Sequence, residues 1–150
     1  TKTVERWLRD KHPAIFSAVV ERPIDLTTMD GMTDYGKPLA VVRALTIDEY
    51  RKHRSILPLT SKPYWLATGW TTNSSPRSSD NFAYCINADG TVSLNYVYDA
   101  IFAPRPAFNL KSSIVVSDST DSDGCYTVES VPGNDGGLYV KNNGLWVKAV

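Results

Sequence analysis

The stretch Phe82-Ala-Tyr-Cys-Ile-Asn-Ala-Asp-Gly-Thr-Val-Ser-Leu-Asn-Tyr-Val97 decides which fold we expect for this chain. Apolar residues alternate on both sides of Asp89-Gly90, which indicates two strands joined by a tight turn. A two-residue loop there would leave the apolar side chains of the two strands on opposite faces. A three-residue loop, with a type I turn opened by Asn87 and with Gly90 in the left-handed region, brings them to one face. We therefore predict three facing pairs on a core face: Phe82 with Tyr96, Tyr84 with Leu94, and Ile86 with Val92.

Short motifs lie in order on both sides of this hairpin. An aromatic strand comes first, then a loop rich in Ser, Thr and Asn, the hairpin turn, and a last strand: Tyr64-Trp65-Leu66, Asn87-Ala88-Asp89-Gly90 and Arg105-Pro106-Ala107-Phe108-Asn109-Leu110. Together with a helix start at Ala44 to Tyr50, they resemble a C-type-lectin-like domain of phage tail proteins and Gram-positive surface proteins. The resemblance covers roughly Val41 to Val116. It departs at Ala103-Pro104, where the family usually has Gly-Val.

The resemblance implies an α+β protein with a C-type-lectin-like fold, in which short helices pack on small, mostly antiparallel sheets. We expect one such domain over residues 1–130, with a helical part at 1–38 and a core at 39–116. Residues 131–150 are expected to form a linker and a terminal β-hairpin that turns at Asn143-Gly144.

The composition is that of a globular domain. The chain has 150 residues, 42% of them hydrophobic and 21% charged, and 16 acidic residues balance 16 basic ones. No net field steers it to nucleic acid, and no stretch approaches the roughly 20 apolar residues that cross a bilayer, so we expect neither nucleic-acid binding nor membrane insertion. The start at Thr1, without a signal peptide, indicates an excised fragment.

The local patterns predict a sequence of short elements. Thr46 and Glu49 have capping-box spacing for a helix over Ile47 to His53. The other expected elements are helices at 3–11 and 13–20, strands at 39–45 and 64–68, and a strand region at 106–116. Residues 71–81 contain no apolar residue and are expected to form an exposed loop, and residues 117–124 a second one.

The residues that usually carry catalysis or metal binding lack the required context. His12 and His53 fall at helix boundaries, which favours structural roles, and no nucleophile elbow, phosphate loop or zinc spacing occurs. The formylglycine-generating enzymes share the lectin-like fold, but neither Cys85 nor Cys125 matches their active-site motif. We therefore predict a protein that is not an enzyme and that has no cofactor.

Two questions about side-chain chemistry stay open at this stage. The two cysteines are either separate thiols or a mutual disulfide. Residues 119–130 partly follow a calcium loop through Asp121 and Asp123, but Ser119 and Ser130 replace two of its carboxylates, so we predict no metal.

What remains is a surface that mixes aromatic rings with amides, hydroxyls and charges. Such mixtures suit sugars or protein epitopes, because flat aromatic anchors give contact area at low entropy cost. We assign Trp65 and Tyr96 to the core. The candidate ligand-binding residues lie in two segments, 70–81 and 95–102: Trp70, Asn73, Arg77, Asp80, Asn81, Asn95, Tyr98, Asp99 and Phe102.

The resemblance implies a non-catalytic recognition domain of a phage tail or virion-fibre protein. It would bind a host cell-surface carbohydrate or protein, and it would be located in the virion or, as the alternative, on a bacterial cell surface. The second hypothesis is a structural module for assembly. In that case the helix at 3–11 or the terminal hairpin would supply the contacts of a homo-oligomer such as a trimer.

Overall fold

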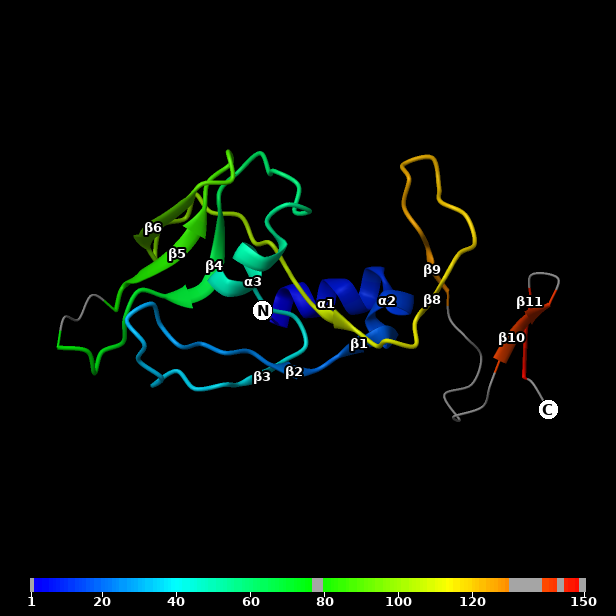
Figure 1. Cartoon of the computed structure of the whole chain (residues 1–150), viewed down its shortest axis with the longest axis horizontal. Helices are drawn as coiled ribbons and strands as arrows, with labels where there is room; N and C mark the ends of the chain where they lie inside the picture. Colours follow the sequence, from blue (N-terminus) through cyan, green and yellow to red (C-terminus); the bar gives the residue numbers. More distant parts are fainter. Residues whose placement is uncertain (1, 77–79, 130–138, 143–144, 149–150) are drawn as a thin grey trace. The chain divides into compact units, whose positions relative to one another are not determined.

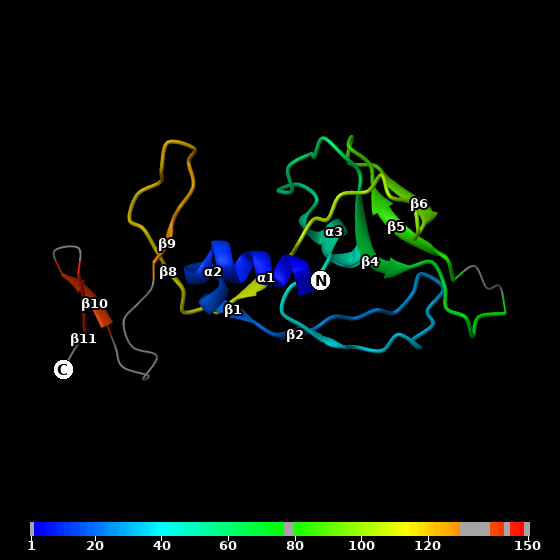
Figure 2. The same cartoon turned by 180° about the vertical axis from the view of Figure 1, so that it is seen from behind.

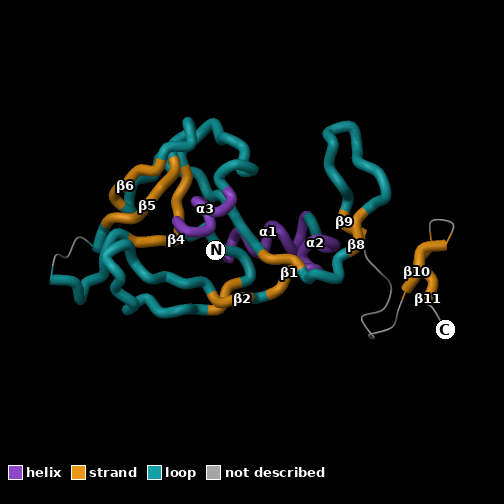
Figure 3. Tube along the Cα trace, viewed as in Figure 1, coloured by secondary structure: helices purple, strands orange, loops and turns teal. Residues whose placement is uncertain are grey.

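The computed structural model of the chain describes residues 2–76, 80–129, 139–142 and 145–148. It is a small α+β protein with short helices and small antiparallel sheets joined by long loops (Figure 1, Figure 3). The chain divides into two compact units, one made of residues 1–5 and 20–109 and the other of residues 6–19 and 110–150. This division does not fall at residue 130, and the expected domain limits stay a prediction.

The described residues contain three helices and eleven strands. The helices are α1 (Lys2–Lys11), α2 (Pro13–Ala18) and α3 (Ile47–His53). Strands β4 (Tyr64–Gly69), β5 (Phe82–Ile86) and β6 (Val92–Tyr96) form a three-stranded antiparallel sheet in that order. The others form two-stranded sheets: β1 (Val19–Val20) with β7 (Asn109–Leu110), β2 (Arg22–Pro23) with β3 (Leu39–Ala40), β8 (Val115–Val116) with β9 (Val128–Glu129), and β10 (Tyr139–Asn142) with β11 (Leu145–Lys148).

The predicted register of the central hairpin is confirmed. Ile86 faces Val92, Tyr84 faces Leu94, and Phe82 faces Tyr96. At the turn, the Gly90 N–H donates to the Asn87 carbonyl at 2.9 Å, and the Asn87 N–H donates to the Thr91 carbonyl at 2.9 Å. Gly90 has a φ of 80°, the left-handed conformation that the three-residue loop requires.

The core of the first unit lies between α3 and one face of the β4-β5-β6 sheet (Figure 1). The predicted capping box begins α3: the Thr46 side chain accepts the Glu49 N–H, and the Glu49 side chain accepts the Thr46 N–H. This fixes the helix so that its apolar positions meet the sheet. The buried cluster consists of Ile47, Tyr50, Tyr64, Leu66 and Ile86.

The assignment of Trp65 to this core was wrong. Side chains alternate along β4, so Tyr64 and Leu66 are buried against α3 while Trp65 faces the other way. Trp65 pairs with Cys85 across the strands and is half-buried, with its ring centroid 4.0 Å from that of Phe102.

Three further expectations on element lengths need correction. The predicted strand at 39–45 is strand only at Leu39–Ala40, followed by a single bridge in which Arg43 exchanges backbone hydrogen bonds with Ala107. The second helix ends at Ala18 rather than at residue 20, because the β-branched Val19 adopts extended geometry, with φ −71° and ψ 138°. The strand region at 106–116 contains only β7 and β8.

The sequence predicts no regular element over residues 21–38, but β2 lies there, and the remaining residues 24–38 form a long irregular ribbon between β2 and β3 (Figure 1, Figure 2). Its two arms are joined by backbone hydrogen bonds from Ile24 N–H to the Pro38 carbonyl, from Leu26 N–H to the Gly36 carbonyl, and from Thr28 N–H to the Met32 carbonyl. We call residues 28–36 the ribbon tip.

In the second unit, α2 begins with Pro13, as expected for proline at a first helical position. The terminal hairpin is confirmed by the pairing of Tyr139 with Lys148 and of Asn142 with Leu145. The predicted turn at Asn143-Gly144 and the linker at 131–137 lie outside the described residues. None of the helices described is long and apolar enough to cross a bilayer.

Candidate functional site

An exposed row of aromatic side chains follows one face of the β4-β5-β6 sheet, the same face that α3 covers at its other end. Phe82, Tyr84 and Tyr96 share this face by the hairpin register. Trp70 follows β4 and continues its alternation on the side of Tyr64 and Leu66, its N–H donates to the Phe82 carbonyl, and its ring centroid lies 6.1 Å from that of Tyr84. We call Trp70, Phe82, Tyr84, Tyr96 and Tyr98 the aromatic row.

The rings of the aromatic row support one another. The centroids of Phe82 and Tyr96 are 4.1 Å apart, and Tyr98 stacks on Tyr96 at 5.1 Å with an interplanar angle of 22°. Exposure rises towards the end of the row, with Trp70 39%, Tyr96 41% and Tyr98 72% exposed. Burial raises the pKa of the Tyr84 phenol, so this hydroxyl stays neutral at neutral pH. The row therefore presents flat apolar rings with phenol hydroxyls among them.

The loop that follows Trp70 is anchored, contrary to the expectation of a fully exposed loop. Thr71 and Thr72 are each only 1% exposed, and Ser75 is buried as well. The Asp30 carboxylate of the ribbon tip accepts hydrogen bonds from the hydroxyls of Thr28 at 2.6 Å, Thr71 at 2.5 Å and Ser75 at 2.9 Å. This loop contains no apolar residue, and hydrogen bonds hold it in place of a packed core.

These bonds keep Asp30 ionised. Hydrogen bonds from the Thr28 and Thr71 side chains, opposed by burial, lower the pKa of the Asp30 carboxyl to about 2. A second carboxylate of the ribbon tip, that of Asp34, accepts a hydrogen bond from the Thr72 hydroxyl.

Backbone contacts complete the attachment of the ribbon tip. The Met29 N–H donates to the Gly69 carbonyl at 3.2 Å, and the Tyr35 hydroxyl donates to the Thr71 carbonyl at 3.4 Å. A Cβ at Gly69 would lie 3.5 Å from Thr28 Cγ2 and 3.5 Å from the Tyr35 ring, so the two segments are in close contact there. The ribbon tip, which sequence reasoning missed, therefore fixes the backbone on both sides of Trp70.

The residues predicted to bind ligand are divided between the two faces of the sheet. Trp70 and Tyr98 belong to the aromatic row, and Asn73 and Asp80 are exposed in the loop between β4 and β5. By register and contact, the other face takes Asn81, opposite Val97, together with Asn95 and Phe102. Arg77 lies outside the described residues.

Asn95 and Asp99 are engaged in holding the edge of the sheet. Across the hairpin, Asn87 is hydrogen-bonded to Thr91 and Val97 to Asn81. Hydrogen-bonded pairs alternate along an antiparallel pair of strands, so the backbone groups of Tyr96 point away from β5. The Asn95 Oδ1 accepts the Tyr96 N–H at 2.8 Å, and the Asp99 N–H donates to the Tyr96 carbonyl at 3.0 Å. The core assignment of Tyr96 was wrong, because β6 is an edge strand whose outer residues stay exposed.

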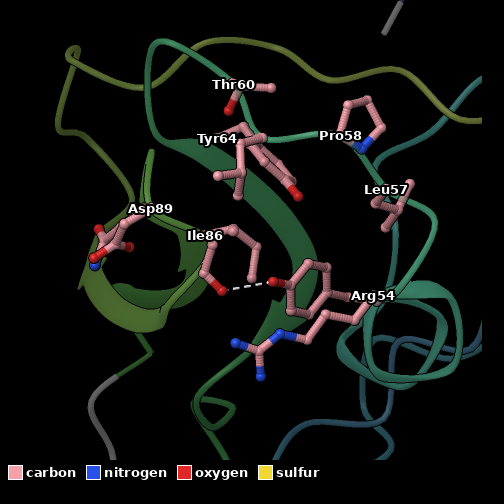
Figure 4. A pocket seen from close by; sticks show the side chains of 11 residues that line it. Arg54, Leu57, Pro58, Thr60, Tyr64, Ile86 and Asp89 are labelled. Carbon is pink, nitrogen blue, oxygen red and sulfur yellow. Dashed lines mark hydrogen bonds between the residues drawn. The ribbon is translucent and has the colours of Figure 1, made fainter.

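A small pocket of about 110 Å³ lies beneath the hairpin turn (Figure 4). Tyr64 and Ile86 line it from the sheet, and Arg54 and Leu57 from the end of α3. The Tyr50 hydroxyl donates to the Gly90 carbonyl at 2.6 Å and ties the turn to the helix. Ligand pockets usually enclose about 300–1,000 Å³. This space is too small to enclose a sugar ring, so the aromatic row is the stronger candidate for binding.

The structure describes both cysteines and most of the segment that partly follows a calcium loop. Cys85 and Cys125 are both free thiols, the first buried and the second exposed. Burial raises the pKa of the Cys85 thiol, which disfavours a reactive thiolate. The Asp121 Oδ1 accepts the N–H groups of Asp123 and Cys125, so it closes a turn. The described part of the chain holds no group of three or more metal-ligating His, Cys, Asp or Glu side chains.

Comparisons with protein-family models, with curated proteins and with solved structures found no match to this chain.

Proposed function

We propose that this chain is a non-catalytic recognition domain of C-type-lectin-like type, from a phage tail or virion-fibre protein, that binds a host cell-surface carbohydrate or protein. The observation that carries the proposal is the exposed aromatic row next to the anchored loop at 71–76. Trp70, Tyr96 and Tyr98 are each about two-fifths or more exposed, and Phe82 and Tyr84 of β5 connect them into one aromatic surface, which differs from singly scattered apolar residues.

The chemistry of the row fits such ligands. Aromatic faces stack on the apolar faces of sugars and on side chains of protein epitopes, and phenols add hydrogen bonds. Asn73, exposed in the neighbouring loop, supplies an amide that both donates and accepts hydrogen bonds. Trp70 and Tyr98 are the anchors of the site, with Asn73 as the adaptable polar contact.

The test is an array of host glycans, cell-wall polymers and surface proteins, probed with the whole chain. Trp70→Ala and Tyr98→Ala are each expected to weaken binding by about tenfold or more, as anchor residues do. Tyr126→Ala is the matched control, because Tyr126 is also an exposed tyrosine, 60% exposed, but belongs to the other unit. If both row variants bind like the wild type, or if the control loses as much, the aromatic row is not the binding site.

A structural module for assembly is the second candidate, favoured by one observation. Val97 and Ile101, which follow β6 on either side of Tyr98 in the sequence, are exposed apolar residues. Light scattering of the wild type and of Tyr98→Ala separates the two functions. A stable oligomer that Tyr98→Ala dissociates would assign the row to assembly, whereas a monomer that binds an arrayed ligand supports recognition.

A further inference from the structure

Trp70, the first residue of the aromatic row, precedes a loop that the Asp30 carboxylate holds, although Asp30 itself is not part of the row. Trp70 lies between two backbone segments with different supports. Its own N–H donates to the Phe82 carbonyl at 3.0 Å, which holds it to the sheet. The residues after it, Thr71 and Thr72, have no sheet partner and are held by Asp30 and Asp34 of the ribbon tip.

We infer that Asp30 is a positioning residue for ligand recognition, one that fixes the loop after Trp70 in its binding geometry before the ligand arrives. The inference rests on the proposed function. Its basis is that one carboxylate gathers hydroxyls from three places in the chain: Thr28 beside it, and Thr71 and Ser75 more than 40 residues further on.

The hydrogen bonds of Asp30 are suited to this role. A carboxylate that accepts several hydroxyl protons forms charge-assisted bonds, which are stronger and more directional than bonds between neutral groups. Thr71 is almost fully buried, so the Asp30 carboxylate satisfies a hydroxyl that is covered in the folded protein. Without Asp30, the segment at 71–75 keeps the bond from Thr72 to Asp34 and the long bond from the Tyr35 hydroxyl, but it loses the bonds that hold the side chains of Thr71 and Ser75.

The cost of losing this anchor falls on binding. A loop that is ordered only when the ligand binds lowers the affinity by the free energy needed to order it. For two or three side chains, this corresponds to a loss of about five- to thirtyfold in affinity. The aromatic rings of β5 and β6 keep their places, since their hairpin does not involve the ribbon tip.

The chain offers a matched control in the same ribbon. Asp25 also accepts hydrogen bonds from a neighbouring threonine, at 3.0 and 2.6 Å from the Thr27 N–H and hydroxyl, and pairs with Lys37 at 2.7 Å. Among the residues that the structure describes, Asp25 has no hydrogen bond to the loop after β4. Asp25→Ala therefore removes a bonded carboxylate from the ribbon without releasing that loop.

The first measurement uses the free protein. Amide hydrogen exchange is expected to speed up by about tenfold at Ser75, whose N–H donates to the Thr72 carbonyl, in Asp30→Ala and not in Asp25→Ala. Thr71→Val removes the buried hydroxyl and keeps the shape of the side chain, and it is expected to speed up exchange at Ser75 as well. Thr71→Ser keeps the hydroxyl and is expected to exchange like the wild type. Unchanged exchange in Asp30→Ala overturns the inference whether or not a ligand is known.

The second measurement is the affinity for the strongest ligand found on the array. Asp30→Ala is expected to lose about five- to thirtyfold, Asp25→Ala less than about twofold, and the double variant Asp30→Ala/Thr71→Val no more than Asp30→Ala, because both changes break one bond. If Trp70→Ala weakens binding and Asp30→Ala does not, the inference fails while the proposed function stands. If Trp70→Ala has no effect, the proposed function fails, and the exchange measurement still decides whether Asp30 orders the loop.

Discussion

Replacing Gly90 with alanine tests how the central hairpin is held against α3. Gly90 has a φ of 80°, and a Cβ there would lie 2.9 Å from Leu59 Cδ2 and 3.7 Å from the Tyr50 hydroxyl. Gly36 is the matched control, because its φ is 66° and a Cβ there would meet nothing within 4 Å. Both substitutions pay the left-handed backbone cost, but only the one at Gly90 also meets a neighbour.

The expected magnitudes follow from these two parts. Left-handed geometry costs an L-residue about 1–2 kcal/mol, and the stiffer unfolded chain returns about 0.4–1 kcal/mol, so Gly36→Ala is expected to destabilise by about 1 kcal/mol. Overpacking adds about 1–3 kcal/mol. Leu59 is largely exposed and can rotate away, which favours the low end of that range. We therefore expect Gly90→Ala to destabilise by about 2 kcal/mol.

The assay is thiol labelling of Cys85 as urea is increased. Cys85 is fully buried in β5, so its reaction with a thiol reagent reports opening of this unit alone, and mass spectrometry separates it from the exposed Cys125. Leu59→Ala is expected to cancel the extra cost in a Gly90→Ala/Leu59→Ala double variant. Equal destabilisation by Gly90→Ala and Gly36→Ala, or no rescue by Leu59→Ala, would refute the docking of the turn on Leu59.

Three further outcomes are expected. Tyr50→Phe removes the buried hydroxyl that serves the turn carbonyl and is expected to cost about 1–3 kcal/mol of unfolding free energy by denaturation; a smaller loss would mean that water replaces the bond. Burial opposes ionisation of Glu49, but hydrogen bonds from the Arg43 side chain and from the Thr46 N–H outweigh it and lower the pKa of this carboxyl. Its stabilising contribution is therefore complete above the unfolded pKa of about 4.3 and lost as the pH falls through the lower folded pKa; a Glu49→Gln variant whose stability falls as steeply as the wild type below pH 5 would contradict this. In native protein Cys125 is expected to react with a thiol reagent at least about a hundredfold faster than Cys85, and similar rates would show that β5 opens readily.

Local patterns carried the parts of the fold that neighbouring residues determine. The hairpin register follows from alternation and from the turn chemistry of Asn87 to Gly90, and the start of α3 follows from the spacing of Thr46 and Glu49. In both cases the partners lie within a few residues of one another. Sequence alone is therefore sufficient to place them.

The predictions that were wrong concern residues whose environment depends on other parts of the structure. Thr71 and Thr72 have the composition of an exposed loop, and only the ribbon tip some 40 residues earlier makes them buried. The only local sign was Asp30-Gly31, a turn signal that marks the tip without naming its partner. Trp65 was misplaced because an aromatic strand buried on one face and half-buried on the other has no clear alternation.

For the candidate site, sequence reasoning selected two segments of the chain but did not predict that their residues lie on opposite faces of the sheet. Trp70 and Tyr98 stand on the aromatic row, whereas Asn95 and Phe102 lie on the opposite face. The division follows from the alternation of side chains along β6, which places Asn95 and Tyr96 on opposite faces, and from the contact of Phe102 with Trp65 on the face away from α3.

The hydrogen bonds at Tyr96 affect whether β6 can pair with a strand of another molecule. An uncharged edge strand invites a strand of another molecule to pair with it, and fibres grow in this way from segments of about six or seven residues. At Tyr96 both backbone groups that an incoming strand would need are already taken by the side chain of Asn95 and the N–H of Asp99. Only Val92 and Leu94 remain to offer outward groups, which is too short a template for fibre growth. The β6 edge can therefore lie uncovered beside the aromatic row without offering a template of that length to a strand of another molecule.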